Sequence, residues 1–82
     1  MEIKAKNIGK VLSDTLIEAG IKSIDDLKSI GSENAFIRIR TIDPSACLNM
    51  LYAIEGAIQD IRWHDLDRIR KDELKDFFDR LK

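Results

Sequence analysis

The tetrapeptide Asn7-Ile8-Gly9-Lys10 is the part of the sequence best suited to bind a phosphate group. In helix–hairpin–helix proteins, backbone N–H groups at a Gly-hydrophobic-Gly turn point at a phosphate, assisted by the positive end of the following helix. In this chain Gly9 allows close approach of the backbone and Lys10 adds positive charge, although asparagine replaces the first glycine of the pattern. Lys4 and Lys6 lie just upstream. We therefore predict a nucleic-acid contact at Asn7, Ile8, Gly9 and Lys10; the alternative is an N-capped helix with solvated lysines.

The residue types that carry catalysis are too few to form an active site. His64 is the only histidine, and it lies between Trp63 and Asp65, where indole and imidazole rings more often pack than react. The acidic pairs Asp25-Asp26 and Asp72-Glu73 fit a solvated helix face better than general acid–base chemistry. The sequence therefore predicts a protein that is not an enzyme and has no small-molecule substrate.

Cys47 is the only cysteine, which excludes an intramolecular disulfide and a CxxC metal site. We expect this residue to lie one turn into an apolar helix, where a buried cysteine behaves as a small hydrophobe. A metal ion would also lack imidazole partners, because His64 is the single histidine. No metal and no cofactor are predicted.

Helices must position the Asn7–Lys10 turn. Apolar residues at helical spacing predict a first helix over 9–19, with Asn7 as its N-cap. Gly20 should end this helix in a left-handed conformation that a β-carbon would disfavour. Ser23 can cap the next helix, and Asp26 occupies the place of the capping-box acid. The two helices should therefore form a tight hairpin.

Two further short helices follow from the same rules. The second is predicted over 24–30, with an apolar stripe and with Gly31 as its end. Ser32 should then cap a third helix over about 33–41. The apolar residues that this third helix should bury are Ala35, Phe36 and Ile39.

Asp43-Pro44 is the clearest boundary in the second half of the chain. Aspartate is a good N-cap and proline suits the first helical position, so a fourth helix is predicted over 44–59. Its apolar residues wrap most of its circumference, which indicates a central helix or one covered by a second subunit.

A turn and a last helix complete the predicted fold. The turn should be anchored by Ile61, Trp63 and Leu66. The last helix, over about 68–81, should bury Ile69, Leu74, Phe77, Phe78 and Leu81. The prediction is one all-α domain over residues 1–82, with residues 1–6 as an N-terminal arm. It should be a compact bundle of about five short helices with a helix–hairpin–helix core, as in SAM-like and HhH-like domains.

The overall charge argues against non-specific nucleic-acid binding. The 82 residues carry 35% charged side chains but a net charge of only −1, whereas proteins that bind phosphate backbones usually have a basic excess or a basic face. A helix–turn–helix reading fails because its recognition helix would present Asp25 and Asp26 to the phosphates. Arginines later in the chain are expected mainly in surface ion pairs, such as Asp67 with Arg70 or Lys71. With no signal peptide and no apolar run of about 20 residues, a cytoplasmic protein without membrane contact is expected.

Several motifs together suggest a family. The order N-I-G-K, L-x-E-A-G-I-K-S-I-D-D-L, G-S-E-N-A-F, L-N-M-L-Y-A-I-E-G-A and W-H-D-L resembles the C-terminal domain of the TfoX/Sxy family, bacterial proteins associated with regulating competence genes. The most specific segments are 48–57 and 63–66. The resemblance implies an all-helical fold, a regulatory role and no catalytic residues. Many relatives carry a separate N-terminal domain before this one. Because this sequence opens with its own methionine at that point, we expect a free-standing version here.

Four residues of these motifs, Asn49, Glu55, Gly56 and Trp63, are interpreted as architectural. Gly56 should permit close helix packing, and Trp63 should plug the end of the bundle with its N–H bonded to a carbonyl. The leading hypothesis is a non-enzymatic regulatory domain that binds DNA through the turn at Asn7–Lys10. The alternative is a protein–protein interaction module that binds no nucleic acid and uses the fourth helix for a partner or a homodimer.

Overall fold

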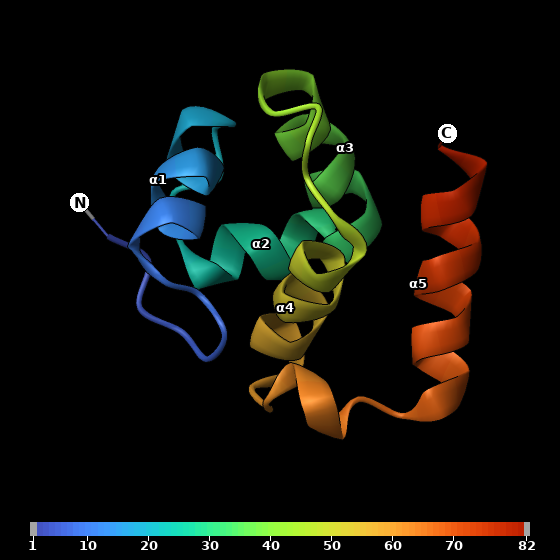
Figure 1. The fold of residues 1–82 in the computed structure, drawn as a ribbon. Helices are drawn as coiled ribbons and strands as arrows, with labels where there is room; N and C mark the ends of the chain where they lie inside the picture. Colours follow the sequence, from blue (N-terminus) through green and yellow to red (C-terminus); the bar gives the residue numbers. More distant parts are fainter. Residues whose placement is uncertain (1, 82) are drawn as a thin grey trace.

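Helices account for nearly all the regular structure in the computed structural model, which describes residues 2–81 (Figure 1). Within these residues the only β pairing is one isolated bridge between Ala5 and Ile8. No described helix is long and apolar enough to cross a membrane. The all-α prediction is confirmed, while Met1 and Lys82, the ends of the predicted domain, lie outside the described residues. The elements are α1 (Lys10–Glu18), α2 (Ile24–Ile30), α3 (Ser32–Ile42), α4 (Leu48–Gln59), the 3₁₀-helix η1 (Trp63–Asp65) and α5 (Arg68–Arg80).

The link between α1 and α2 follows the predicted turn chemistry. Gly20 has φ +87°, and the next amide, that of Ile21, donates a 2.8 Å hydrogen bond to the carbonyl of Leu16. The Ser23 hydroxyl accepts a 3.0 Å hydrogen bond from the Asp26 amide and so caps α2. The Asp26 carboxylate accepts a 3.3 Å hydrogen bond from the Lys22 amide. A capping box would instead use the amide of the N-cap residue, Ser23.

The predicted N-cap of α3 is wrong by one residue. Gly31, at φ +87°, both ends α2 and occupies the N-cap of α3, so Ser32 becomes the first helical residue. The Ser32 side chain is buried and donates a 2.6 Å hydrogen bond to Glu55 on α4. The serine therefore joins two helices rather than capping one. The apolar face of α3 is buried as predicted, at Ala35, Phe36 and Ile39.

Helix α4 begins at Leu48 and not at Pro44, so the predicted start is wrong. Asp43 is the C-cap of α3, and its carboxylate accepts hydrogen bonds from both the amide and the hydroxyl of Ser45. This local turn competes with a helix for the same backbone groups and delays the next helix. Cys47 becomes the N-cap of α4 and is exposed, contrary to the expected buried position.

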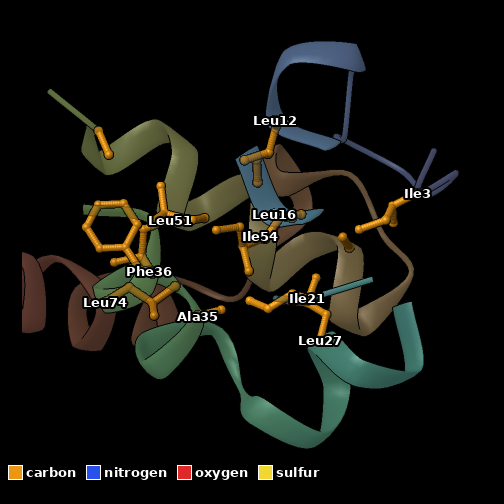
Figure 2. Close-up of a cluster of buried hydrophobic side chains, with 14 of the residues drawn as sticks. Ile3, Leu12, Leu16, Ile21, Leu27, Ala35, Phe36, Leu51, Ile54 and Leu74 are labelled. Carbon is orange, nitrogen blue, oxygen red and sulfur yellow. The ribbon is translucent and has the colours of Figure 1, made fainter. Parts of the chain in front are cut away.

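Helix α4 occupies the centre of the molecule and packs against α2, α3, α5 and η1. Figure 2 shows Leu51 and Ile54 of this helix between Phe36 and Leu74 on one side and Leu16, Ile21 and Leu27 on the other. The prediction of a central helix is confirmed, because neighbouring helices of the same chain cover its apolar face.

Helix α5 packs against α3 and α4 through only part of its predicted apolar set. Leu74 is fully buried, and the Phe78 ring lies 5.8 Å from that of Phe36. Ile69 is 71% exposed, so its predicted burial is wrong. At this end of α5 the inward position belongs to Arg70, whose guanidinium reaches Glu55 on α4.

The residues before α1 are attached to it. The Ile3 side chain is buried, and its amide donates a 2.7 Å hydrogen bond to the Ser13 hydroxyl on α1. The segment predicted as an arm therefore contributes to the core and fixes where the chain enters the Asn7–Lys10 turn.

Candidate nucleic-acid interface at the N-terminal turn

Asn7 connects the N-terminal turn to the loop after α4. Its side-chain Nδ2 donates a 2.8 Å hydrogen bond to the carbonyl of Ile61, and its Oδ1 accepts a 3.1 Å hydrogen bond from the amide of Trp63. The residue has φ +70°, a left-handed conformation that asparagine tolerates better than most residues. The prediction of Asn7 as an N-cap is wrong: Gly9 holds that position, without a side-chain hydrogen bond.

Gly56 makes this connection sterically possible. A β-carbon at residue 56 would lie 2.5 Å from Asn7 Nδ2, 2.8 Å from the carbonyl oxygen of Ile61 and 3.1 Å from the Trp63 nitrogen. The predicted role of this glycine in close packing is supported, but the approaching groups are a side chain and a loop and not another helix. Asp60, at φ +59°, turns the chain at the end of α4 and brings that loop back toward Gly56.

The rest of the predicted turn leaves the start of α1 open. Ile8 is half-buried, and its amide donates to the carbonyl of Ala5 at 3.3 Å. Gly9 is exposed and extended, at φ −89°, with no atom within 4 Å of where a β-carbon would stand. Lys10 is exposed and forms a 3.3 Å ion pair with Asp14 one turn along the helix. The first amides of α1 have no acceptor within the helix.

A pocket of about 410 Å³ lies between the turn and η1. It includes two groups that the sequence reading placed nowhere near the turn, Arg62 and the buried Ala53 of α4. The W-H-D-L motif pointed to this region, but no pattern connected it with residues 6 and 7. The lining residues are Lys6, Asn7, Ala53, Arg62, Trp63 and His64.

Aromatic and cationic side chains surround Trp63. The His64 ring stacks on the indole at 3.9 Å between centroids, as expected for a packing histidine, and Tyr52 stacks at 5.9 Å. Lys71 Nζ lies 5.9 Å from the indole centroid and donates a 3.1 Å hydrogen bond to the His64 carbonyl. The N–H of Trp63 that these contacts show bonded is its backbone N–H, to Asn7, whereas the prediction concerned the N–H of the indole.

The positive charges near the turn are only partly neutralised. Lys6 forms an exposed 3.1 Å ion pair with Asp60, and Lys10 pairs with Asp14. The Arg62 side chain is exposed and makes no hydrogen bond or ion pair with any residue in the range 2–81.

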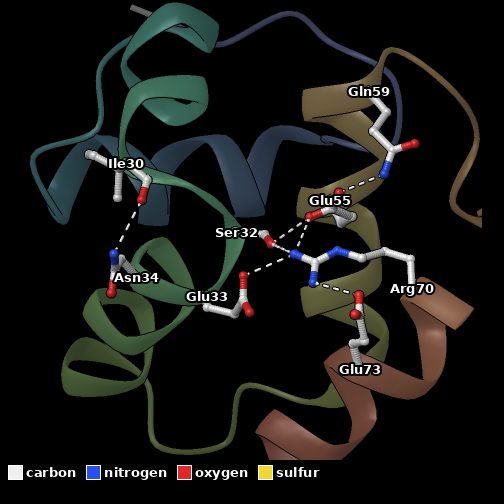
Figure 3. A network of polar contacts seen from close by, with 8 residues as sticks. All are labelled: Ile30, Ser32, Glu33, Asn34, Glu55, Gln59, Arg70 and Glu73. Carbon is white, nitrogen blue, oxygen red and sulfur yellow. Dashed lines mark hydrogen bonds and ion pairs between the residues drawn. The ribbon is translucent and has the colours of Figure 1, made fainter.

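Arg70 belongs to a different, structural site (Figure 3). Its guanidinium contacts Glu33 at 2.9 Å, Glu55 at 3.0 Å and Glu73 at 3.3 Å, so the predicted pairing with Asp67 is wrong. Asp67 caps α5 instead, accepting from the Ile69 amide. A side chain held by three carboxylates is not available to a phosphate.

Glu55 is charged at neutral pH because of this network. Burial raises the pKa of Glu55, but hydrogen bonds from Arg70, Ser32 and Gln59, together with the Arg70 charge, outweigh burial and lower that pKa below its usual value. The hydrogen bond to Glu55 raises the pKa of Arg70, against a smaller opposing effect of burial. Both groups therefore keep their charges, and α5 is joined to α4 by an ion pair.

Among the residues that the structure describes, no three His, Cys, Asp or Glu side chains are grouped so that they could hold a metal ion. The chemistry that this surface offers is cationic and aromatic contact. It suits recognition of an anionic group.

Comparison with known proteins identifies related chains. The model of the TfoX C-terminal domain matches residues 2–78. A crystal structure of an uncharacterized protein from Listeria monocytogenes, in a triclinic form, is 54% identical with a TM-score of 0.94, over 95% of this chain and 89% of that one. A protein of unknown function from the same organism, in a tetragonal form, is 53% identical with a TM-score of 0.94, over 96% and 98% of the two chains. No curated protein matches.

Proposed function

Because the chain belongs to the TfoX C-terminal domain family, we propose that it is a regulatory domain that binds DNA through phosphate contacts at the N-terminal turn. The contacting groups are the exposed backbone at Gly9, the first amides of α1 and the ammonium group of Lys10. No enzyme family is indicated by the match or by the related structures.

The observation that carries this proposal is the fixed and open start of α1. The Asn7 side chain holds the turn against residues 61 and 63 by two hydrogen bonds, while Gly9, two residues further on, has open space where a β-carbon would stand. A helix N-terminus with free amides favours an anion, through both hydrogen bonds and the helix dipole. The site needs little reorganisation to accept a phosphate oxygen.

The local charge supports the same proposal despite the net charge of −1. Lys4, Lys6 and Lys10 are all exposed on and just before the turn, and Arg62 lines the same pocket as Lys6. The two nearby carboxylates form exposed ion pairs, which contribute little free energy and give way to a phosphate. A protein that is acidic overall can therefore still present a small cationic surface to DNA.

The test is fluorescence anisotropy with a labelled DNA duplex, titrated across salt. If the four cationic groups contact phosphates, log affinity should fall with log salt at a slope between about −2 and −4. Lys10→Glu should weaken binding at least about tenfold and reduce the slope by about one.

Lys75→Glu is the matched control. Lys75 forms the same kind of exposed i,i+4 ion pair, with Asp79 at 2.9 Å, but it lies on α5, on the other side of the molecule from α1 (Figure 1). This variant makes the same change in net charge and should bind DNA like the wild type within about twofold. Equal losses in both variants would mean that net charge and not the turn decides binding.

A protein-binding role is the second candidate function. Val11 follows Lys10 directly and is 77% exposed, the most exposed of the large hydrophobic residues, and the chain lacks the positive net charge that is typical of a DNA-binding protein. If anisotropy detects no DNA binding even at low salt, a pull-down comparing the wild type with Val11→Ser becomes the decisive measurement. Loss of a specific partner in that variant would assign the α1 surface to a protein.

A further inference from the structure

The pocket beside Trp63 has the size and the lining of a small ligand site. Its volume of about 410 Å³ lies within the roughly 300–1,000 Å³ of typical ligand pockets. Ala53 and the Trp63 side chain supply apolar surface, and Lys6 and Arg62 supply positive charge. This combination of a flat apolar surface with two cations is distinct from the turn at Gly9 and Lys10, neither of which lines the pocket.

The walls of the pocket are held in place by contacts among the lining residues and their neighbours. Asn7 fixes the backbone at residues 61 and 63, and Gly56 allows that contact. Tyr52 stacks against the indole of Trp63, and Lys71 holds the carbonyl of His64. Since these partners fix the site before any ligand arrives, binding would order few additional groups.

Two features of the lining indicate which ligand fits. The Arg62 side chain is exposed and has no hydrogen-bond or ion-pair partner among residues 2–81, so its guanidinium is free to take a phosphate in a bidentate contact. His64 stacks on Trp63 with one face and is itself exposed, which leaves its other face for a flat ring. Both hydrogen-bonding atoms of the Asn7 amide are already engaged, so this residue does not read the edge of a base.

We propose that this pocket binds one nucleotide unit, with the phosphate at Arg62 and Lys6 and the base stacked on the face of His64 that is turned away from Trp63. Stacking without contacts to the base edges gives little preference among bases. The ligand is either a free mononucleotide or an unpaired nucleotide of a single strand, since both present the same base and phosphate. This inference goes beyond the proposed function and does not depend on the binding of duplex DNA.

Trp63 is the only tryptophan in the chain, so its fluorescence reports on the pocket directly. Adenosine 5′-monophosphate, inorganic phosphate, adenosine and a single-stranded oligodeoxyadenylate are titrated separately at low salt. We expect a saturable change with the oligonucleotide or the mononucleotide, and weaker or no binding of phosphate and adenosine alone. A response to both nucleotide probes identifies a free nucleotide as sufficient, and a response to the strand alone identifies an unpaired nucleotide in DNA or RNA.

Arg62→Glu should weaken nucleotide binding at least about tenfold, and the exposed Arg38→Glu on α3 is the control with the same charge change. His64→Ala is a second variant that leaves the Arg62 charge in place and should weaken binding through loss of stacking. Circular dichroism checks that each variant keeps its helices. The proposal is overturned if no nucleotide gives a saturable change, if phosphate alone binds as tightly, or if Arg62→Glu and His64→Ala bind like the wild type.

The two proposals fail separately. Lys10→Glu should lose duplex binding in the anisotropy assay yet keep the nucleotide-dependent change in Trp63 fluorescence. A protein that binds the mononucleotide but no duplex would contradict the proposed function and support the pocket. The reverse result would contradict the pocket alone.

Discussion

At the scale of single residues, the turn depends on a pair that no local pattern connects. Asn7 donates to residue 61 and accepts from residue 63, and Gly56 leaves the space in which its amide lies. Glycine in the middle of a helix is normally a weakness, costing roughly 0.5–1 kcal/mol relative to alanine. Its presence within α4 is explained by the approach of Asn7, since a methyl group there would collide with the amide and with the backbone of Ile61.

Gly56→Ala should therefore destabilise the protein, although the same change at an uncrowded helical site would stabilise it. We expect a loss of about 1–3 kcal/mol in the free energy of unfolding, because the carbonyl of Ile61 is backbone and cannot move away cheaply. Urea unfolding measures this change. Gly9→Ala, with open space at its β-carbon, is the control and should change stability by less than about 1 kcal/mol. A Gly56→Ala variant as stable as the wild type would contradict the steric argument.

At the scale of elements, α5 is joined to the rest of the fold by a few apolar side chains along one face and by one ion-pair network. Leu74 and the Phe78 ring pack toward α3, and Arg70 reaches Glu33 and Glu55 on two other helices. Figure 3 shows the guanidinium lying between these carboxylates. A helix docked in this way has a defined inner face, and Ile69 is not on it.

Two substitutions on α5 distinguish this inner face from the face predicted by apolar pattern alone. Leu74→Ala should cost about 2–5 kcal/mol in unfolding free energy because it leaves a cavity at a fully buried site. Ile69→Ser should change stability by less than about 0.5 kcal/mol, since that side chain is 71% exposed. Thermal or urea unfolding of the two variants decides the point, and similar losses in both would show that α5 is rotated from the position described.

The Glu55–Arg70 pair makes a pH-dependent contribution to stability. The pKa of Glu55 is lowered in the folded protein, so the unfolded chain binds its proton more readily. The stabilisation is therefore complete above the ordinary glutamate pKa of about 4.3 and is lost as pH falls through the lower folded value.

Glu55→Gln should accordingly cost on the order of 1–3 kcal/mol at neutral pH, because it leaves Arg70 short of one charged partner. The cost should shrink as the pH falls through the lowered pKa of Glu55, because the wild-type glutamate then becomes neutral as well. Urea unfolding at several pH values measures this trend. Glu18→Gln, at an exposed position on α1 without an ion pair in the described part of the chain, is the control and should change stability by less than about 0.5 kcal/mol at neutral pH.

At the scale of the whole molecule, the helices enclose α4 and leave its apolar residues little free surface. The buried residues of α4 face α2, α3 and α5 of the same chain, and Figure 1 shows α4 between α1 and α5. The large hydrophobic side chains that do remain exposed are scattered over three helices: Val11, Ile37, Ile42 and Ile69. Scattered apolar residues of this kind are normal for a protein surface and give no reason to expect a dimer interface.

We therefore expect a monomer in solution. Light scattering coupled to size-exclusion chromatography should give the mass of one chain, 9.4 kDa, at concentrations up to the high micromolar range. A stable dimer would show that α4 or the exposed residues of α1 and α5 form an interface that the enclosed core does not predict.

The sequence by itself determined those features that depend on neighbours a few residues apart. Gly20 and Gly31 take left-handed conformations, Ser23 caps α2, and α3 buries its predicted residues, because turn geometry, capping and helical periodicity are local. Even there, two local rules competed, and the Asp43 turn with Ser45 prevailed over a helix starting at Pro44. The local rules therefore fixed the class of fold and the positions of most helices.

Only the tertiary structure decided what several polar side chains do. Asn7 is of a residue type that commonly caps helices, yet the hydrogen-bond partners of its side chain lie 54 and 56 residues away. Arg70 has acidic neighbours along its own helix, yet its shortest contacts are with α3 and α4. The pocket likewise joins residues 6 and 7 to residues 53 and 62–64. A polar group bonds to whichever partner the packed helices bring within reach, and helix packing is set by the whole apolar core, which no short stretch of sequence specifies.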